Sequence, residues 1–389
     1  MKKKGIVIAF ITLTITYVLA ILLIVLPKKE YSENENRYLA TFPQFTLKSV
    51  TSGEFMSGVE DYVTDHFPFR DFWISLKSET AIALGQREIN GIYVCEDDYL
   101  IQKYNPLANK KRIKDTFSNF AAKLKEETGN DAVFMLVPTA VTICDDKLPK
   151  MAESSMTASQ LEDIKELCED LNCIDCAEEL ENAWEEAAAG ENQIYYRTDH
   201  HWTTYGAYVG YCEYCRSMGL ECVDIDDLSM ETVADDFYGT VSSKLNRFNE
   251  KADCITVYSN PSDELAVKYY TQYVDDENSK FTESDSLYNF DYLGKKDKYS
   301  MFLDGVHPLV EITNENAQTD RVLMLVKDSY ANSMVPYLAS NYAKIYVLDT
   351  RYYKNGAVAF AGSHTDITDV CVLYNMITID SDNGIRGIF

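Results

Sequence analysis

The pattern of hydrophobic and polar positions divides the chain into three regions. An uncharged apolar run extends from Gly5 to Pro27, with lysines on both sides. A helical repeat follows over residues 53–84 and is interrupted at Pro68. From residue 88 onward, short apolar runs alternate with amphipathic stretches. The pattern therefore predicts one long apolar helix, a short helical segment and a larger domain of strands and helices.

The third region predicts a mainly parallel sheet. Runs with the length and composition of strands lie at 131–138, 173–176, 321–326, 343–349 and 369–377, and helical patterns lie at 111–128, 158–171, 177–188 and 331–342. This alternation is typical of βαβ units in an α/β domain. An acidic, Tyr-rich segment at about 225–300 interrupts the alternation and predicts a β-rich insertion.

The apolar run near the amino terminus is long enough to cross a membrane. At about 1.5 Å per residue, a helix of this length spans a hydrocarbon core of about 30 Å. A cleaved signal peptide is the alternative, but its apolar core is usually shorter and no small-residue cleavage site follows. We expect residues 1–29 to be a retained single-pass anchor in the cell membrane. Residues 30–90 then form a stalk and helical segment, and residues 91–389 form an extracytoplasmic domain.

Composition narrows the classes of partner. Of the 389 residues, 46% are apolar, which is enough to fill a large folded core. The chain carries 36 Lys and Arg against 62 Asp and Glu, a net charge of −26. Such a charge repels nucleic acid and other phosphate-rich ligands. Nucleic acid is therefore excluded as an expected partner.

Ten cysteines in an exported chain permit disulfides. The pairs Cys173 with Cys176 and Cys212 with Cys215 have the spacing of zinc ligands. However, 35 residues separate the two pairs, and the second pair lies in a helical pattern. We interpret these cysteines as buried side chains and expect no zinc site.

Ser329 follows the predicted strand at 321–326, at the start of a predicted helix. Open α/β sheets place their reactive groups at this edge. The first N–H groups of a helix and its positive dipole also suit the binding of an oxyanion. A simple helix-capping role for Ser329 is the alternative.

The stretch Asp199-His200-His201-Trp202 supplies the groups that a nucleophilic serine needs. His201 would accept the proton of Ser329, and Asp199 would orient His201, because residues two apart share one side of an extended loop. Trp202 would line the substrate site. His200 would point away from His201 and serve in packing.

A metal site is a second interpretation of the adjacent histidines. The remaining histidines at 66, 307 and 364 are scattered, and no D-x-D or H-x-x-x-H spacing accompanies the motif. We therefore expect acid/base chemistry, with no metal. A metal-dependent phosphoesterase stays the least favoured function.

Arg351, Tyr352 and Tyr353 follow the predicted strand at 343–349, so they should lie at the same sheet edge as Ser329. Aromatic rings stack on sugar rings, and a guanidinium group donates hydrogen bonds in a fixed fork. We expect these three residues to bind substrate. Pairing of Arg351 with Asp349 is the equally weighted alternative.

Several motifs together resemble the bacterial DHHW family. They are ENRYLATFP, DYVTDHFPFRDFW, TDHHWTTYGA, DGVHPL, VKDSYANSMVPYLA and LDTRYY. That family is related to alginate O-acetyltransferase-like proteins of the cell envelope with an SGNH-hydrolase-like fold. The resemblance implies a three-layer α/β/α domain, and it maps the relatives' Asp-x-His-Trp and Ser onto Asp199, His201, Trp202 and Ser329.

The resemblance also implies a function. It implies O-acetyl transfer to, or removal from, a cell-envelope or exported polysaccharide, without a metal or soluble cofactor. A membrane-bound acyltransferase would supply the acetyl group. Asn332 and Gly239 are the candidates for binding the oxyanion. A catalytically silent glycan-binding or scaffold protein with the same fold is the alternative.

Overall fold

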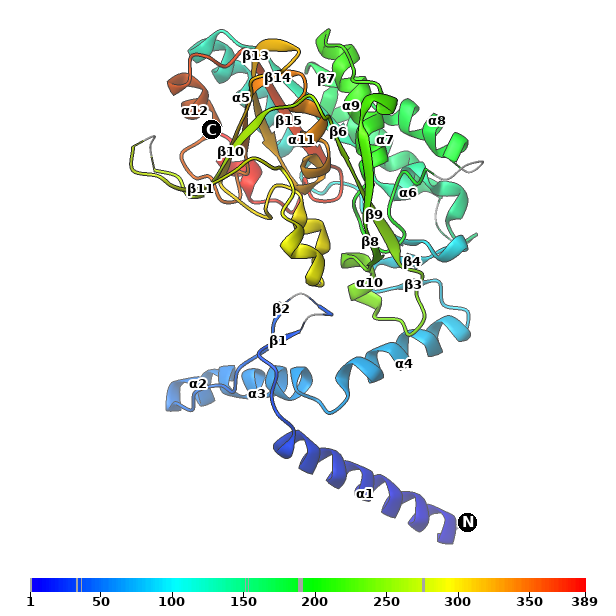
Figure 1. The fold of residues 1–389 in the computed structure, drawn as a ribbon. Coiled ribbons are helices and arrows are strands. Elements are labelled where there is room, and N and C mark those ends of the chain that lie inside the picture. Colours follow the sequence, from blue (N-terminus) through cyan, green and yellow to red (C-terminus); the bar gives the residue numbers. More distant parts are fainter. Residues whose placement is uncertain are drawn as a thin grey trace. The chain divides into compact units, whose positions relative to one another are not determined.

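The chain forms two compact units in the computed structural model, which describes residues 2–389 except 33, 36, 151, 153, 188–191, 275 and 276 (Figure 1). Unit 1 consists of Met1–Asn90 and Ser242–Glu250. Unit 2 consists of Gly91–Val241 and Lys251–Phe389. Each unit is described by itself below.

Unit 1 is mostly helical. Its elements are α1 (Lys2–Val25), β1 (Tyr31–Ser32), β2 (Arg37–Tyr38), α2 (Leu47–Ser52), α3 (Glu54–Asp65), α4 (Arg70–Ala83) and β3 (Glu88–Ile89). Within α1, Lys4–Val25 is long and apolar enough to be a candidate membrane span, and none of it is buried. The break between α3 and α4 falls at the predicted position, because Pro68 cannot donate a helical hydrogen bond.

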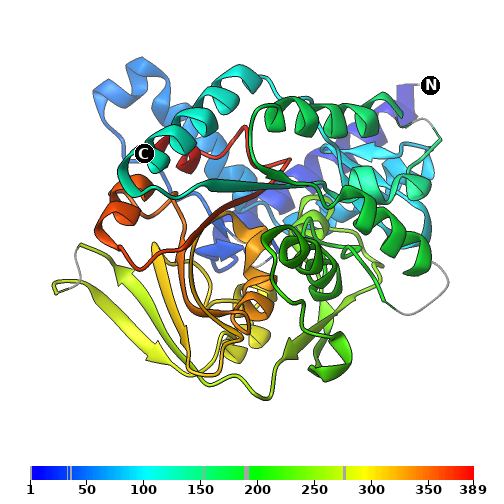
Figure 2. The same ribbon diagram turned by 90° about the horizontal axis from the view of Figure 1, so that it is seen from above.

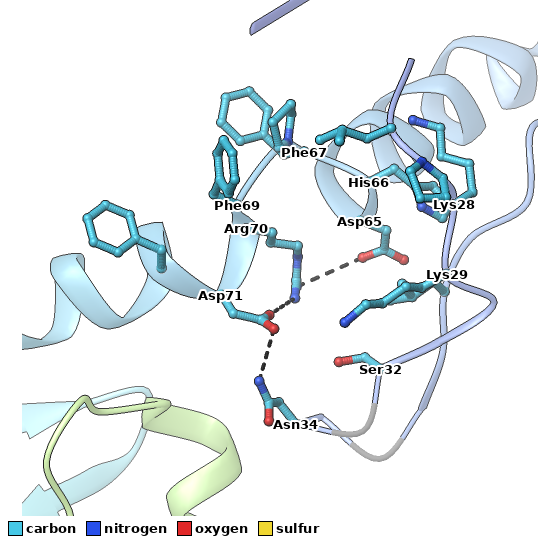
Figure 3. A pocket seen from close by; sticks show the side chains of 15 residues that line it. Lys28, Lys29, Ser32, Asn34, Asp65, His66, Phe67, Phe69, Arg70 and Asp71 are labelled. Atoms are coloured by element: carbon cyan, nitrogen blue, oxygen red, sulfur yellow. Dashed lines mark hydrogen bonds and ion pairs between the residues drawn. The ribbon is translucent and has the colours of Figure 1, made fainter. Parts of the chain in front are cut away.

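A polar cluster joins the segments of unit 1. Arg37 makes a two-point pair with Asp65, with N–O distances of 2.9 Å and 2.5 Å, and Arg70 donates to Glu35 at 2.8 Å. The Arg37 hydrogen bonds lower the pKa of Asp65 to about 2. Arg70 and Asp71 line a pocket of about 490 Å³ (Figure 3). Charge pairing therefore links the helices and strands of unit 1.

Unit 2 is built on an eight-stranded sheet, with strand order β11-β10-β12-β14-β13-β15-β6-β7. The five strands from β14 to β7 are parallel, and β12, β10 and β11 extend the sheet as antiparallel strands. The bounds are β6 (Ala132–Val137), β7 (Cys173–Ile174), β10 (Leu265–Gln272), β11 (Lys280–Ser284), β12 (Leu309–Asn314), β13 (Thr319–Lys327), β14 (Tyr342–Leu348) and β15 (Asp369–Asn375). The sheet is the expected mixed α/β architecture.

Helices cover both faces of this sheet, with α5 and α12 on one face and α9 and α11 on the other (Figure 2). The helices are α5 (Lys110–Thr128), α6 (Ala140–Ile143), α7 (Ser154–Cys168), α8 (Ala177–Ala187), α9 (Thr204–Met218), α11 (Val335–Leu338) and α12 (Ala357–Ser363). Every residue of β6 and β15 is buried. This two-sided cover explains why the central strands are continuous apolar runs in the sequence.

The smaller elements of unit 2 are β4 (Ile92–Val94) with β5 (Leu100–Gln102), and β8 (Ser229–Phe237) with β9 (Asp253–Ser259). Helix α10 (Thr240–Leu245) crosses the division between the units. Strands do occur in the region predicted as an insertion, but β10 and β11 belong to the central sheet. That part of the region is therefore an antiparallel edge of the main fold.

One predicted helix is wrong in extent. Residues 331–342 do not form a continuous helix; a 3₁₀ turn at Ser329–Ser333 precedes the four-residue α11. Pro336 lies in the first turn of α11 and has no N–H to bond to the preceding turn. Asp328, and not Ser329, caps the turn, because its side chain accepts from the backbone N–H of Tyr330. Ser329 therefore lies in a short turn without a long helix behind it.

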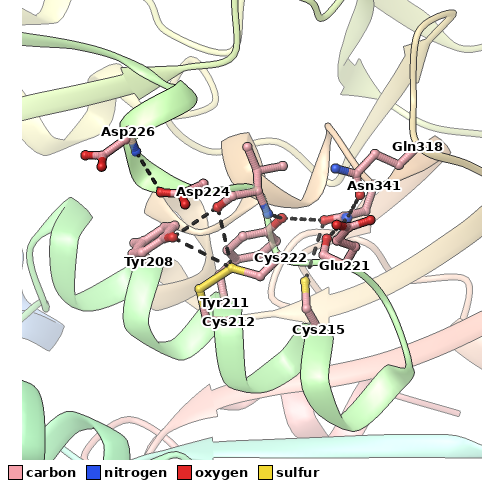
Figure 4. Close-up of a disulfide and its surroundings, with 11 residues drawn as sticks. Tyr208, Tyr211, Cys212, Cys215, Glu221, Cys222, Asp224, Asp226, Gln318 and Asn341 are labelled. Atoms are coloured by element: carbon pink, nitrogen blue, oxygen red, sulfur yellow. Dashed lines mark hydrogen bonds between the residues drawn. A yellow bond between two sulfur atoms is a disulfide. The ribbon is translucent and has the colours of Figure 1, made fainter.

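Two disulfides are present among the described residues, Cys168–Cys173 and Cys212–Cys222. The second joins α9 to the loop that follows it, while Cys215 on the same helix stays a buried thiol (Figure 4). The disulfides agree with the expectation that an exported chain permits them, but Cys173 and Cys212 are half-buried and not fully buried as interpreted. Because both are in disulfides, the four-thiolate set considered for zinc does not exist in this state.

Candidate active site

A tight hairpin places the Asp-His-His-Trp motif in unit 2. Tyr195 forms an antiparallel bridge with Trp202, and Thr203 then caps α9 by accepting from the N–H of Gly206. The buried carboxylate of Asp253 holds the base of the hairpin by accepting from the backbone N–H groups of residues 197 and 198 at 3.0 Å and 2.8 Å. The motif is therefore rigidly mounted at the start of a helix.

The hairpin brings Asp199 and His201 together through a local turn, and not through the extended loop that we expected. The Asp199 Oδ1 atom accepts from the backbone N–H of His201 at 3.0 Å and contacts His201 Nδ1 at 2.5 Å. This arrangement is an Asx turn, in which an Asp side chain bonds to the backbone two residues on. The spacing of two residues is thus required by the turn.

His201 lies between Asp199 and Ser329. Its Nε2 atom is 2.8 Å from Ser329 Oγ. Asp199 and His201 are buried, with 3% and 4% of their surfaces exposed, whereas Ser329 is partly exposed. The structure thus brings together the three residues that the sequence predicted from positions about 130 apart.

Asp199 is held as a carboxylate. Its burial opposes ionisation, but the nearby histidines, the hydrogen bond from His201 and the backbone N–H of Thr240 together lower its pKa. Thr240 donates to Asp199 Oδ2 from its backbone N at 2.7 Å and from its hydroxyl at 3.0 Å. An ionised carboxylate only accepts hydrogen bonds, so the Nδ1 of His201 carries a proton. In the neutral ring, Nε2 is then free to accept the proton of Ser329.

Tyr299 is a site residue that sequence reasoning missed. Its ring stacks on the imidazole of His201, with centroids 3.8 Å apart and planes 10° apart. Its hydroxyl lies 3.1 Å from the carbonyl oxygen of Ser329 and 3.2 Å from Ser333 Oγ. Burial raises the pKa of Tyr299, which keeps this hydroxyl a donor. Tyr299 therefore links the histidine to the serine turn.

Comparison with protein families places the chain. The family model described as DHHW protein matches residues 79–348, more than half of the sequence. The chain belongs to the DHHW family. The comparison with curated proteins found no match.

Solved structures resemble this DHHW protein over most of its length. A DHHW family protein from Eubacterium siraeum is 26% identical, with 77% of this chain and 96% of that chain covered and a TM-score of 0.63. PatB1 from Bacillus cereus, solved with a sulfonyl adduct, is 20% identical, with 76% and 97% covered and a TM-score of 0.61. The O-acetyltransferase domain of Pseudomonas putida AlgJ is 14% identical, with 75% and 93% covered and a TM-score of 0.45. The first two likenesses show a shared fold.

The tryptophan of the DHHW motif has a structural role in place of the expected substrate contact. Trp202 is fully buried, and its indole N–H donates to the carbonyl oxygen of Tyr330 at 2.9 Å. A Cβ atom at Gly210 would lie 2.8 Å from the indole, so the ring packs directly on the backbone of α9. Trp202 therefore ties the DHHW hairpin to the turn that carries Ser329.

Gly239 does not act as the oxyanion donor that we considered. Its N–H donates to Thr198 Oγ1 at 3.2 Å, and it lies beside Asp199, on the far side of His201 from Ser329. A Cβ atom at this position would lie 2.2 Å from Asp199 Oδ2. Gly239 is instead required for the loop after β8 to approach Asp199 closely.

The residues after β14 lie at the same sheet edge as Ser329, because β13 and β14 are parallel with Val326 beside Leu348. Arg351 pairs with Asp349 at 2.8 Å and 2.5 Å, which is the alternative weighed against substrate binding. Tyr353 is only 3% exposed, so the expectation that it stacks on a sugar is wrong. Tyr352 is 53% exposed, and the guanidinium of Arg351 lies over its ring at 5.7 Å from the centroid.

His200 lies outside the hydrogen-bonded pair formed by His201 and Ser329, as expected. The expectation that His200 points away from His201 is wrong, because the centroids of the two imidazole rings are 3.9 Å apart. Its Nδ1 atom is 2.6 Å from Thr240 Oγ1. Ligand atoms of Asp199, His200 and His201 all lie within 4.8 Å of one another, which is a spacing that a metal ion can use. However, Asp199 and His201 are already bonded to each other, and His201 also to Ser329. These bonds favour the acid/base interpretation.

Proposed function

We propose that this DHHW protein is an extracytoplasmic enzyme that transfers acetyl groups to, or removes them from, hydroxyls of a cell-envelope or exported polysaccharide. One observation carries the proposal: His201 Nε2 lies 2.8 Å from Ser329 Oγ while Asp199 holds the other ring nitrogen. This is the arrangement of an activated serine nucleophile. The family resemblance to alginate O-acetyltransferase-like proteins is the basis for proposing acetyl as the transferred group and a polysaccharide as its acceptor.

The chemistry follows from the order of contacts. Ser329 Oγ forms a bond to the acetyl carbon of the donor ester, and its proton passes to His201 Nε2. When the donor C–O bond breaks, His201 returns that proton to the departing alkoxide. An acceptor hydroxyl or water then attacks the acetyl-serine, with His201 again taking and returning one proton. Asp199 keeps its charge throughout and stabilises the imidazolium.

The fold and the amino-terminal helix support the location. The likeness to solved structures supports an SGNH-hydrolase-like α/β/α domain for unit 2. The candidate span in α1 supports a retained anchor. The family resemblance alone implies that a membrane-bound acyltransferase supplies the acetyl group. Amino-terminal sequencing of the mature protein should begin at or near Met1. A start beyond Pro27 would rule out the anchor.

The test is turnover of a chromogenic acetyl ester by the full chain in detergent, beside its Ser329→Ala variant. We expect the substitution to remove turnover and acetylation of a soluble polysaccharide acceptor, which mass spectrometry follows. Ser340→Ala is the control, because Ser340 is a buried serine whose hydroxyl donates to Asp263 at 2.8 Å and not to the candidate site. Equal activity of Ser329→Ala and the wild type would refute the mechanism. Polysaccharide binding without any turnover would identify a silent scaffold.

A further inference from the structure

A buried lysine stands two residues before Ser329, and the proposed mechanism does not use it. Lys327 is the last residue of β13 and is 3% exposed. Its Nζ atom donates to Asn332 Oδ1 at 2.7 Å and lies 3.6 Å from Asp349 Oδ2. Burying an ammonium group is costly even when it is paired, so a buried lysine beside the candidate site suggests a role for its charge.

The contact with Lys327 fixes the orientation of the Asn332 side chain. An ammonium group has three donors and no acceptor, so the amide atom that faces it is the oxygen. The Nδ2 group then lies on the other branch of the amide. No described residue accepts a hydrogen bond from it.

The turn that holds Asn332 also holds Ser329. In a 3₁₀ turn, side chains three residues apart lie one above the other. Ser329 and Asn332 are three apart in the turn Ser329–Ser333. The side chains of Asn332 and Ser329 thus lie on one side of the turn.

We propose that Lys327 is a positioning residue that holds the Asn332 amide with its N–H groups ready for the oxyanion formed on the acyl group. The proposal rests on the proposed function only in taking Ser329 as the nucleophile. A preorganised donor needs no reorganisation when charge develops, which is why such groups stabilise transition states strongly. Without Lys327, the amide can rotate and present its oxygen, which repels the oxyanion.

The loop after β14 supports the lysine. Asp349 is fully buried and accepts the two-point pair from Arg351, besides lying near Lys327. Burial lowers the pKa of Lys327, and Asp349 opposes that effect. A chain of contacts therefore runs from Arg351 through Asp349 and Lys327 to Asn332. This chain gives the pairing of Arg351 a role in the site.

The test compares Lys327→Met, Asn332→Ala and the double variant, in the full chain with a small acetyl ester. Each single substitution should lower kcat by about 10²–10³-fold, with KM within about threefold of the wild type. Because Lys327 acts through Asn332, the double variant should be no slower than Asn332→Ala by more than about threefold. Lys344→Met is the control, since Lys344 on β14 bonds to Tyr346 and not to the site.

Two results would overturn the proposal. One is a double variant whose loss is the product of the two single losses. The other is a Lys327→Met variant that turns over the ester at the wild-type rate.

A second measurement separates this proposal from the proposed function. Phenylmethylsulfonyl fluoride reacts with an activated serine and also places charge on an oxygen, so mass spectrometry gives a labelling rate for Ser329 without acetyl chemistry. Labelling without ester turnover would refute acetyl transfer, and slower labelling of Lys327→Met would still support the positioning role. Equal labelling of the variant would overturn that role. A wild-type Ser329 that is not labelled would overturn both.

Discussion

Two loops leave neighbouring parallel strands at one edge of the sheet and use their polar groups differently. The loop after β13 begins with Asp328, which accepts hydrogen bonds from its own turn and from Asn375, the last residue of β15. These bonds fix Ser329 but leave its hydroxyl to His201. The loop after β14 begins with Asp349, which takes up the guanidinium of Arg351.

The difference shows that position at the sheet edge does not make a residue reactive. Both loops satisfy the rule that reactive groups follow the carboxyl ends of parallel strands. Only the first loop places an accessible hydroxyl, that of Ser329, in contact with a base, His201. In the second loop the polar atoms satisfy one another, so its effect on the reaction is indirect.

The largest expected effect is that of Asp199→Asn. The amide can donate to His201 Nδ1 and so favour the wrong tautomer, which removes the base that Ser329 needs. We expect kcat for a small acetyl ester to fall by roughly 10³–10⁴-fold. The same replacement at Asp349 should mainly lower the free energy of unfolding, by about 2–4 kcal/mol. Equal losses of kcat in both variants would erase the distinction between the loops.

A smaller effect should follow from Gly239→Ala. The added methyl group would lie 2.2 Å from Asp199 Oδ2, so the carboxylate has to move. Because His201 is held by that carboxylate, we expect kcat to fall by about 100-fold while labelling of Ser329 becomes slower. Gly294→Ala is the matched control, since no atom lies within 4 Å of a Cβ atom there. A Gly239→Ala enzyme of wild-type rate would show that Asp199 is dispensable as an orienting group.

Arg351→Ala tests the second loop, the one after β14, and should have a smaller effect on the reaction. Its loss leaves Asp349 with Lys327 alone, so we expect a three- to tenfold lower kcat/KM on a small ester and on a polysaccharide alike. The melting temperature should fall as well, because a buried carboxylate loses two charged hydrogen bonds. Tyr352→Ala, at an exposed ring, should weaken only the polysaccharide reaction. A loss on polysaccharide alone for Arg351→Ala would instead make Arg351 a binding residue.

The smallest effect concerns pH. The folded protein lowers the pKa of Asp199, so its ionised form stabilises the fold above the pKa of about 3.9 in the unfolded chain. That contribution is lost as pH falls below this value. The difference in melting temperature between the wild type and Asp199→Asn should be constant from about pH 7 to 5 and shift against the wild type below about pH 4. A shift in the opposite direction would contradict an ionised Asp199.

Much of the sheet and the pair of partners for His201 could be predicted from the sequence. Buried parallel strands such as Ala132–Val137 are unbroken apolar runs, and this pattern does not depend on distant contacts. The Asx turn of Asp199 and His201 is also local. Ser329 could be joined to them because its place after a strand limits where it can lie.

The remaining site residues depend on contacts that have no local pattern. Tyr299 lies about 100 residues from His201 in the chain, in a segment with many tyrosines, so nothing marks its ring as the one that stacks. Trp202 and Tyr353 are aromatic residues of the kind that stack on sugars, but both are buried and cannot do so. Their burial depends on the whole fold and has no local sequence pattern. The helical pattern at 331–342 contains Pro336, which has no backbone N–H, and the chain forms a 3₁₀ turn at Ser329–Ser333 before the short helix α11.

The close approach of Gly239 to Asp199 means that the DHHW motif alone does not identify the active members of the family. The motif that names the family would survive unchanged in a descendant that acquired one methyl group at position 239, because the crowding falls on Asp199 from outside the motif. If the proposed function holds, that descendant would keep Asp199, His201 and Ser329 but lose most of its activity. A single codon change outside the motif would then separate an active member of the family from a nearly silent one.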